Sequence, residues 1–416
     1  MLRPGQVVVL CALALLTLGV VMVSSAGMEV QTLGSVEEGP RPGITPRSIL
    51  FSRSSAYFAL SLAAIVICSG VPVGRLAAAL ERCGPAAPRA SIDGLMPTAI
   101  GVVALLALLG TVYLPGIGHE VNFSHRWLRF PIPGLGALTL QPSEIAKWGL
   151  LGLLAWYAAR RGAYMKRFVL GFVPGVAALG VVSGFVAMED LGTGVLMAAA
   201  GGLLLLAAGA RFWHFALFIP PGVAGVVFLI LTSEYRVKRL LAFLDPYAEA
   251  QTTGYQMIQS MAAIAEGGGA GRGLGNGLYK FGYLPEDTND FLFAIICEEL
   301  GIAGAAVVVS LLLLLLWSGS KIVARETSPV LRLFGVGVLA TIGIQAMINL
   351  IVVTGLGPTK GIALPLVSSG GTGWILTAAC LGLLASMDHH HAIEDAAAGD
   401  ESEAAEEEAD GGVALA

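Results

Sequence analysis

The segment Tyr283-Leu-Pro-Glu-Asp-Thr-Asn-Asp290 closes a polar, glycine-rich stretch and runs directly into the apolar Phe291-Leu-Phe-Ala-Ile-Ile296. The polar stretch, residues 233–290, also carries many aromatic and apolar residues, which disfavours a disordered linker. Long loops in compact proteins are usually functional when they are ordered. A structured polar loop beside an apolar body therefore predicts chemistry or binding at this place.

The rest of the chain is strongly apolar. Of its 416 residues, 56% are hydrophobic and 13% are charged, and the mean hydropathy is +0.78. These values are typical of a polytopic membrane protein and exclude an ordinary soluble enzyme. We predict an all-α polytopic integral membrane protein of about ten transmembrane helices, with one large extracytoplasmic loop, 233–290, between spans seven and eight. The candidate spans are 7–23, 56–73, 95–114, 143–159, 168–188, 193–210, 213–232, 291–317, 331–354 and 373–387.

The Lys and Arg residues indicate the orientation, because cytoplasmic loops of membrane proteins carry an excess of both. With both termini in the cytoplasm, the inside segments hold twelve of these residues and the short outside loops hold six. The five basic residues of the long loop nearly cancel this bias. The tail 388–416 holds ten acidic residues and no Lys or Arg. It predicts a disordered acidic cytoplasmic extension of a membrane domain 1–387.

The sequence lacks a P-loop, a dinucleotide-binding glycine pattern and a zinc motif, which disfavours a nucleotide-driven motor. The spacing of the five cysteines suggests no disulfide framework or metal site. The first apolar segment, 7–23, has the features of either a signal peptide or a retained span, and we expect a retained span.

Four polar patches fall on the predicted outer side. The first contains the charged residues Arg126, Glu144 and Lys147, and the second contains Asp190. Glu144 and Lys147 lie three residues apart on one helix face, so they form a local ion pair or present a cation to an anionic substrate together with Arg126. Neighbouring Trp127 fits an interfacial anchor as well. The turn at Asp190 fits a solvated turn, an acid/base pair or a divalent-ion site.

The third patch is the long loop itself. Arg236, Lys238 and Arg239 begin it, and such side chains suit phosphate oxygens. Asp290 ends it and fits both the N-cap of the next helix and a catalytic base. Glu298 lies further along that helix, where ionisable groups are usually paired or functional, and Lys147 is a candidate partner.

The fourth patch joins Pro358-Thr-Lys-Gly-Ile-Ala-Leu-Pro365 to Ser368-Ser-Gly-Gly-Thr372. Prolines and glycines at this density predict a non-helical segment. At membrane depth such a segment must line protein or water.

In this order the patches resemble the SEDS family of shape, elongation, division and sporulation proteins. The family pattern reads Asn-Gly-Ala-Arg-Arg-Trp, Gln-Pro-Ser-Glu-Leu-Ala-Lys, Pro-Asp-Leu/Phe-Gly-Thr, Gly-Tyr-Gln…Leu-Pro-Glu…Asp-Phe and Pro-Leu-Pro…Ser-Tyr-Gly-Gly. The match covers roughly residues 110–385, and Gly357-Pro-Thr-Lys-Gly361 looks like the division branch rather than the elongation branch. The chain departs from the pattern at Phe123, Ser124, His125, Glu189 and Ser369.

The resemblance implies a peptidoglycan glycosyltransferase that polymerises lipid II, a disaccharide-pentapeptide on undecaprenyl diphosphate, without a nucleotide. Asp290 matches the proposed catalytic aspartate. The residues assigned to substrate binding are Arg126, Trp127, Lys147, Arg239, Lys360 and Ser368, and those assigned to support are Glu144, Asp190, Glu286 and Glu298.

The resemblance further implies a bacterial inner-membrane location with the active site on the extracytoplasmic side. A divalent cation, Mg²⁺ or Mn²⁺, is an optional cofactor, and its ligands are unknown. The expected partners are a class B penicillin-binding protein and other division proteins, with no nucleic acid. Two other functions stay open, a flippase for the same lipid and a non-catalytic division or shape scaffold.

Overall fold

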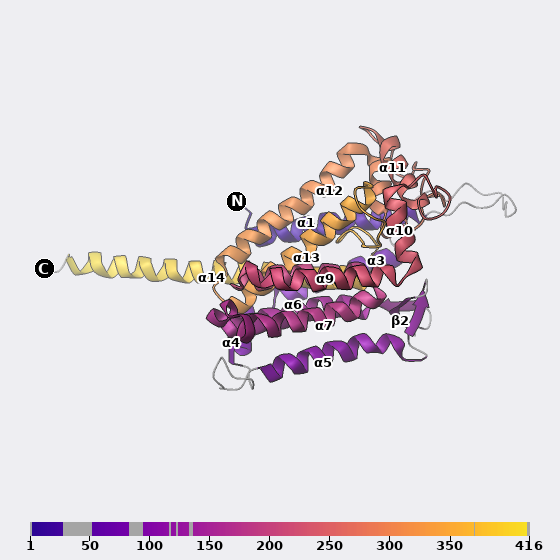
Figure 1. Cartoon of the computed structure of the whole chain (residues 1–416). Coiled ribbons are helices and arrows are strands. Elements are labelled where there is room, and N and C mark those ends of the chain that lie inside the picture. The colour runs from indigo at the N-terminus through magenta and orange to yellow at the C-terminus, as the bar shows by residue number, and fades with distance from the viewer. Residues whose placement is uncertain are drawn as a thin grey trace.

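The computed structural model describes residues 2–27, 52–82, 95–115, 118–121, 124–132, 136–369 and 371–413. Long helices lie side by side in one bundle, and shorter elements cover one of its ends (Figure 1). The helices are α1 (Pro4–Ala26), α3 (Arg53–Ser69), α4 (Val73–Arg82), α5 (Met96–Gly110), α6 (Pro142–Arg161), α7 (Val173–Glu189), α8 (Leu191–Ala207), α9 (Phe212–Leu231), α10 (Glu234–Leu244), α11 (Tyr255–Gly267), α12 (Leu292–Arg325), α13 (Pro329–Val353) and α14 (Thr372–Val413).

Short helical turns extend some of these helices. They are the 3₁₀ segments η2 (Thr111–Tyr113) and η3 (Gly162–Lys166) and the π segment η4 (Phe168–Phe172). Each of the ten predicted spans contains a helix. Among the described residues, six helices are long and apolar enough to cross a membrane, or seven if the bent pair α3–α4 counts as one span. The chain is therefore a multi-pass helical membrane protein.

The all-α prediction is wrong for the connection between α5 and α6. It forms an antiparallel sheet of three strands, β1 (Gly118–Val121), β2 (Ser124–Ile132) and β3 (Gly136–Leu140), in the order β1-β2-β3. Pro131 disfavours a helix there because it lacks the backbone N–H, and aromatic Trp127 and Phe130 favour a strand. The sheet lies at the same end of the bundle as α10 and α11 (Figure 1).

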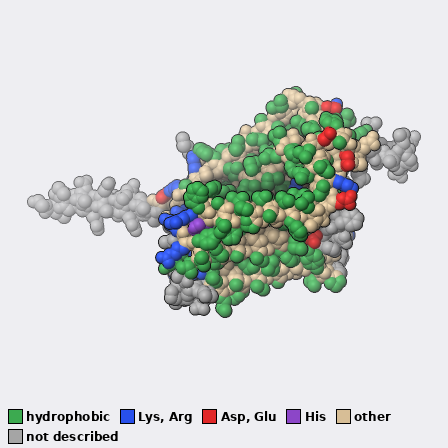
Figure 2. All heavy atoms as spheres, viewed as in Figure 1, with side chains coloured by type: hydrophobic (Ala, Val, Ile, Leu, Met, Phe, Trp, Pro, Cys, Tyr) green, Lys and Arg blue, Asp and Glu red, His purple; other side chains and the backbone are tan. Residues whose placement is uncertain are grey.

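The start of α1 and the protruding part of α14 both lie toward the opposite end of the bundle, and α14 projects well beyond it (Figure 1). Lys and Arg side chains gather on that end in the space-filling view (Figure 2). Helix α14 includes the predicted span 373–387 and continues through the acidic segment to Val413. Asp388 and His391 at the start of that segment are each only 5% exposed, and the Asp388 carboxylate accepts a bond from the backbone N–H of Gly5 at 3.1 Å. The Ala- and Glu-rich sequence favours this extension, since both residues are good helix formers.

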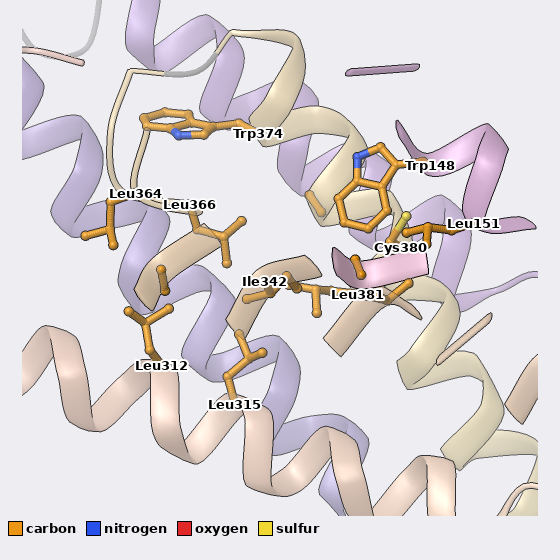
Figure 3. Close-up of a cluster of buried hydrophobic side chains, with 14 of the residues drawn as sticks. Trp148, Leu151, Leu312, Leu315, Ile342, Leu364, Leu366, Trp374, Cys380 and Leu381 are labelled. Carbon is orange, nitrogen blue, oxygen red and sulfur yellow. The ribbon is translucent and has the colours of Figure 1, made fainter. Parts of the chain in front are cut away.

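The irregular connection from α13 to α14 is folded into the protein core. Leu364 and Leu366 of this connection are each 1% exposed, and they lie among side chains of α12, α13 and α14 (Figure 3). The indole N–H of Trp374 on α14 donates to the carbonyl of Ser368 at 2.6 Å. The fourth polar patch therefore lines protein, which is the surrounding that a non-helical segment requires at membrane depth.

Candidate functional site

Asp290 is held in a tight turn that leads into α12. The turn begins at Glu286, whose φ of +59° is unusual for a non-glycine residue. The backbone N–H groups of Asn289 and Phe291 both donate to the Glu286 carbonyl, at 3.1 and 3.2 Å. Phe291 occupies the N-cap position of α12, so the N-cap role predicted for Asp290 is wrong. The Asp290 carboxylate is free of that structural task.

The connection between α13 and α14 packs directly against Asp290. A Cβ on Gly361 would overlap one Asp290 carboxylate oxygen, so only glycine permits this close approach. Asn349 of α13 donates from its side-chain nitrogen to the carbonyls of Asp290 and Ile362, both at 2.7 Å. The N–H of Ser369 donates to the carbonyl of Thr288 at 3.0 Å. The two segments are thus joined on both sides of the carboxylate.

The surroundings of Asp290 favour its protonated form. Burial, and to a smaller extent the nearby Glu286 and Asp190, raise the pKa of its carboxyl against the opposing effect of Arg239 and Arg126, and the resulting pKa is about 7. Burial also raises the pKa of Asp287 to about 6. A carboxyl that exchanges its proton near neutral pH is suited to general base catalysis.

Cations from three separate parts of the chain form one cluster, in which Arg126 and Arg239 act on this carboxylate. Burial lowers the pKa of Lys360 to about 8, and Asp190 opposes this effect while Arg236, Arg126 and Arg239 add to it. The Lys360 side chain lies against Gly192 at the start of α8, 2.8 Å from the position of a Cβ there. Clustered cations of this kind create a strongly positive local field.

Arg126 reaches the cluster from a β-bulge. Opposite the consecutive residues His119 and Glu120, β2 pairs through Trp127 and His125, so Arg126 is the extra residue. Bulges often redirect a side chain next to a functional site. The Arg126 guanidinium donates to the Glu189 carbonyl at 2.7 and 3.1 Å and lies 3.8 Å from the Asp190 carboxylate.

Asp190 is a buried helix cap rather than part of a solvated turn. The residue is 6% exposed. Its carboxylate accepts hydrogen bonds from the backbone N–H and the hydroxyl of Thr193, at 3.2 and 2.9 Å. This geometry caps the N-terminus of α8. The negative charge of Asp190 therefore serves both the cap and the placement of Arg126.

Helix α10 contributes two arginines, of which the prediction included only Arg239 among the site residues. Arg239 donates to the Thr359 carbonyl at 3.1 Å and lies over the Tyr235 ring at 4.5 Å. Arg236 donates to the Met188 and Leu229 carbonyls, at 2.7 and 3.0 Å, and ties α10 to α7 and α9. Its spacing of three residues from Arg239 places both on one helix face, a signal the sequence does contain. Lys238 instead is exposed and pairs with Glu234 at 2.8 Å.

For three other predicted site residues, the structure shows local contacts or partial burial rather than contact with Asp290. Lys147 is 2% exposed and is bonded to Glu144 at 2.8 Å, which matches the local ion-pair interpretation. The Ser368 hydroxyl accepts from the N–H of Leu364 at 3.0 Å, so it closes a turn of the connection. Trp127 is partly buried on β2 next to Arg126.

Glu298 and the adjacent Glu299 hold the glycine-rich part of the long loop against α12. Helix α12 is broken at Gly301, where φ is +65°, a conformation natural for glycine. The break lets the N–H of Arg272 donate to the Glu298 carbonyl and that of Gly273 donate to the Glu299 carbonyl, both at 2.9 Å.

Both glutamate side chains are fully buried and have partners within the protein. Glu299 pairs with Lys280 at 2.7 Å and accepts from the Ser25 hydroxyl of α1 at 2.8 Å. Glu298 accepts from the N–H of Leu278, and the Arg272 guanidinium lies 3.7 Å away. The predicted pairing of Glu298 with Lys147 is therefore wrong. The loop folds back along α12 and supplies the partners itself.

A resident metal ion does not fit these side chains. Among the described residues, no three His, Cys, Asp or Glu side chains are grouped closely enough to hold one. Arg126, Arg239 and Lys360 form a cationic cluster near Asp190 and Asp290, and such cations suit an anionic ligand.

Fold and site together define a multi-pass membrane protein with a buried carboxylate and a cluster of Arg and Lys side chains at one end of its bundle. The sequence profile of the FtsW/RodA/SpoVE family of cell cycle proteins matches residues 6–393, and the chain belongs to this family. The "Probable peptidoglycan glycosyltransferase FtsW" of Geobacter metallireducens is 33% identical over 92% of this chain and 94% of its own.

Two further similarities extend this comparison. "Stage V sporulation protein E" of Bacillus subtilis is 38% identical over 70% of this chain and 78% of its own. A solved structure described as "Structural coordination of polymerization and crosslinking by a peptidoglycan synthase complex" contains a chain with a TM-score of 0.66 and 24% identity. That similarity covers 92% of this chain and 97% of the solved one, and it supports the fold.

Proposed function

We infer that this chain is a peptidoglycan glycosyltransferase that polymerises lipid II during septal wall synthesis in cell division. Two relatives, of 33% and 37% identity, are named "Probable peptidoglycan glycosyltransferase FtsW". The observation that carries the proposal is the Asp290 carboxyl, whose pKa is raised to about 7, beside Arg126, Arg239 and Lys360. Family and site point to the same chemistry independently.

In the proposed reaction, Asp290 takes the proton of an acceptor sugar hydroxyl as its oxygen attacks the donor anomeric carbon. The new carbon–oxygen bond forms with inversion while the bond to the diphosphate breaks. A base in this position contributes about 10²–10⁴-fold in rate. Arg126, Arg239 and Lys360 neutralise the negative charge that develops on the departing lipid diphosphate, so activation by a nucleotide is unnecessary.

We assign the chain ten spans in the bacterial inner membrane, with both termini cytoplasmic and loop 233–290 outside. The ten helices, the location of the start of α1 and the protruding part of α14 toward one end, and the Lys and Arg gathered there support this orientation (Figures 1 and 2). The site then faces the side on which the cell wall is built. The acidic end of α14 extends into the cytoplasm.

A divalent cation and a protein partner belong to the same proposal. Since the described side chains do not fit a resident metal, Mg²⁺ or Mn²⁺ would enter as a counter-ion of the substrate diphosphate. The expected partner is a class B penicillin-binding protein that crosslinks the new strands, together with other division proteins. The solved synthase complex, which coordinates polymerization and crosslinking, supports the existence of such a partnership for a chain of this fold.

The decisive experiment measures polymer formation from lipid II by purified protein, with and without its cognate class B partner and with Mg²⁺ or Mn²⁺. We expect polymer from wild type and about 10²–10⁴-fold less from Asp290→Asn. Asp287→Asn is the matched control, since Asp287 has a raised pKa in the same loop but no place in the proposed reaction. It should polymerise like wild type.

Two outcomes would overturn the proposal. Wild-type rates in a folded Asp290→Asn variant would remove Asp290 from the mechanism. An absence of polymer in every condition, with folded protein and an active partner, would leave the flippase or the scaffold as the function.

A further inference from the structure

Two amide side chains of α13 connect the candidate site to the protein interior. Gln345 and Asn349 lie four residues apart, and so project from the same face of the helix. Gln345 donates to the Ala363 carbonyl at 2.9 Å, and Asn349 donates to the Ile362 and Asp290 carbonyls, each at 2.7 Å. Both amides therefore grip the connection that carries Lys360.

Asn349, unlike Gln345, also binds the segment that carries Asp290. Its residue exposure is 2%, and its two N–H groups face two carbonyl oxygens. This fixes the amide orientation, because the opposite one would bring its oxygen against both carbonyls. One planar group thus sets the separation between the two segments of the site.

We propose that Asn349 is a positioning residue for glycosyl transfer: it holds the backbone of Asp290 and the Lys360-bearing connection at a fixed separation. The inference deepens the proposed function and rests on it. Asn349 itself contacts backbone carbonyls and acts through the two segments it joins.

The consequence concerns the approach of the Asp290 carboxylate to Gly361, where the fit leaves no room for a Cβ. If the two segments separate, the carboxylate gains solvent and shifts away from the point where the acceptor hydroxyl must lie. A displacement of about 1 Å is enough to cost about 10²-fold in rate. Substrate binding by the remaining cations is less sensitive, because charge attraction falls only slowly with distance.

The test compares three substitutions of Asn349 in the lipid II polymerisation assay with the full chain and its partner. Asn349→Leu removes both bonds, and Asn349→Asp keeps the shape but presents only acceptors to the two carbonyls. We expect kcat to fall about 10- to 100-fold in both, with a smaller change in KM. Asn349→Gln keeps the donors on a longer side chain and should restore part of kcat.

The matched control is Thr341→Val on the same helix. Thr341 is 0% exposed, and its hydroxyl donates to the Gly337 carbonyl within α13 at 2.8 Å, far along the helix from the site. This variant should keep the wild-type kcat per folded molecule. Thermal unfolding of every variant gives the folded fraction to which rates are normalised.

A second measurement separates positioning from a purely structural role. The acidic limb of the kcat/KM profile should move to lower pH in Asn349→Leu, because a more solvated Asp290 ionises more easily. Thr341→Val should leave that limb in place. Wild-type kcat in folded Asn349→Leu and Asn349→Asp, together with an unmoved limb in Asn349→Leu, would overturn the inference.

The same assay distinguishes this failure from failure of the proposed function. An inactive wild type would refute the function. An active wild type, an inactive Asp290→Asn and Asn349 variants that behave like Thr341→Val would refute the positioning role alone.

Discussion

The long loop 233–290 contributes to the surroundings of two carboxylates, Glu299 of α12 and its own Asp290, and these surroundings are opposite in kind. Around Glu299, the protein supplies an ammonium, a hydroxyl and backbone N–H groups, and the side chain is completely buried. Around Asp290, burial and nearby acids raise the pKa to about 7, so its ionised form is poorly stabilised. The two residues are only nine positions apart in sequence. The difference teaches that the first carboxylate holds structure and the second is kept reactive.

The largest expected effect comes from breaking the structural side of this comparison. Lys280→Met leaves the Glu299 charge buried without its ammonium partner, and we expect a loss of about 3–5 kcal/mol in the free energy of unfolding. Lys238→Met is the matched control, because its pair with Glu234 is exposed and screened by water, so its loss should change the stability little. Denaturant unfolding or limited proteolysis of the loop measures both. Equal, small losses would show that the buried pair does not hold the loop.

A smaller effect is expected from disturbing the reactive side alone. In Gly361→Ala, the added methyl group displaces the Asp290 carboxylate, and polymerisation should fall by about 10- to 100-fold. Gly269→Ala is the control, since a Cβ there meets no atom within 4 Å. Rates are measured at equal amounts of folded protein. A wild-type rate in Gly361→Ala would show that the carboxylate tolerates movement.

The pH dependence sharpens the comparison further. Asp290 must lose its proton to act as a base, so activity should rise with pH through about 7, by about tenfold per unit on the acidic side. Lys360 must keep its proton to attract the diphosphate, so activity should fall above about 8. A kcat/KM profile from pH 5 to 10 checks both limbs. An acidic limb near pH 4 would contradict the raised pKa of Asp290.

The pH dependence of folding stability has the opposite sign to that of activity. Because the folded-state pKa of Asp290 lies above its ordinary value of 3.8, folding stability decreases as pH rises from there to about 7. Asp290→Asn removes this penalty. At pH 8 the variant should therefore unfold at the same temperature as wild type or a higher one, while its activity is lost.

Much of the fold could be predicted because apolar spans have a strong sequence signal. The sheet could not, since its short strands carry one proline, two glycines and only a weak pattern. Arg126, Asp190, Arg239, Lys360 and Asp290 lie together as the four patches suggested. Their roles in catalysis stay predictions.

Asn349 escaped prediction for a physical reason. One amide in an apolar helix fits many structural roles, and its partner Asp290 lies 59 positions away. Lys147 shows the converse case. Its charge suggested substrate binding, but its proximity to Glu144 in sequence already allowed the buried pair that the structure contains.

The contacts of α1 determine when this molecule can be complete. Ser25 forms a hydrogen bond with Glu299, 274 residues later in the chain, and Gly5 forms one with Asp388, 383 residues later. Helices emerge from the ribosome in order, so α1 enters the bilayer long before either partner has been synthesised. During biogenesis, α1 must therefore stay in the membrane without its final packing partners until α14 has been inserted. A chain truncated before α14 would leave α1, the first helix synthesised, without its contacts to α14.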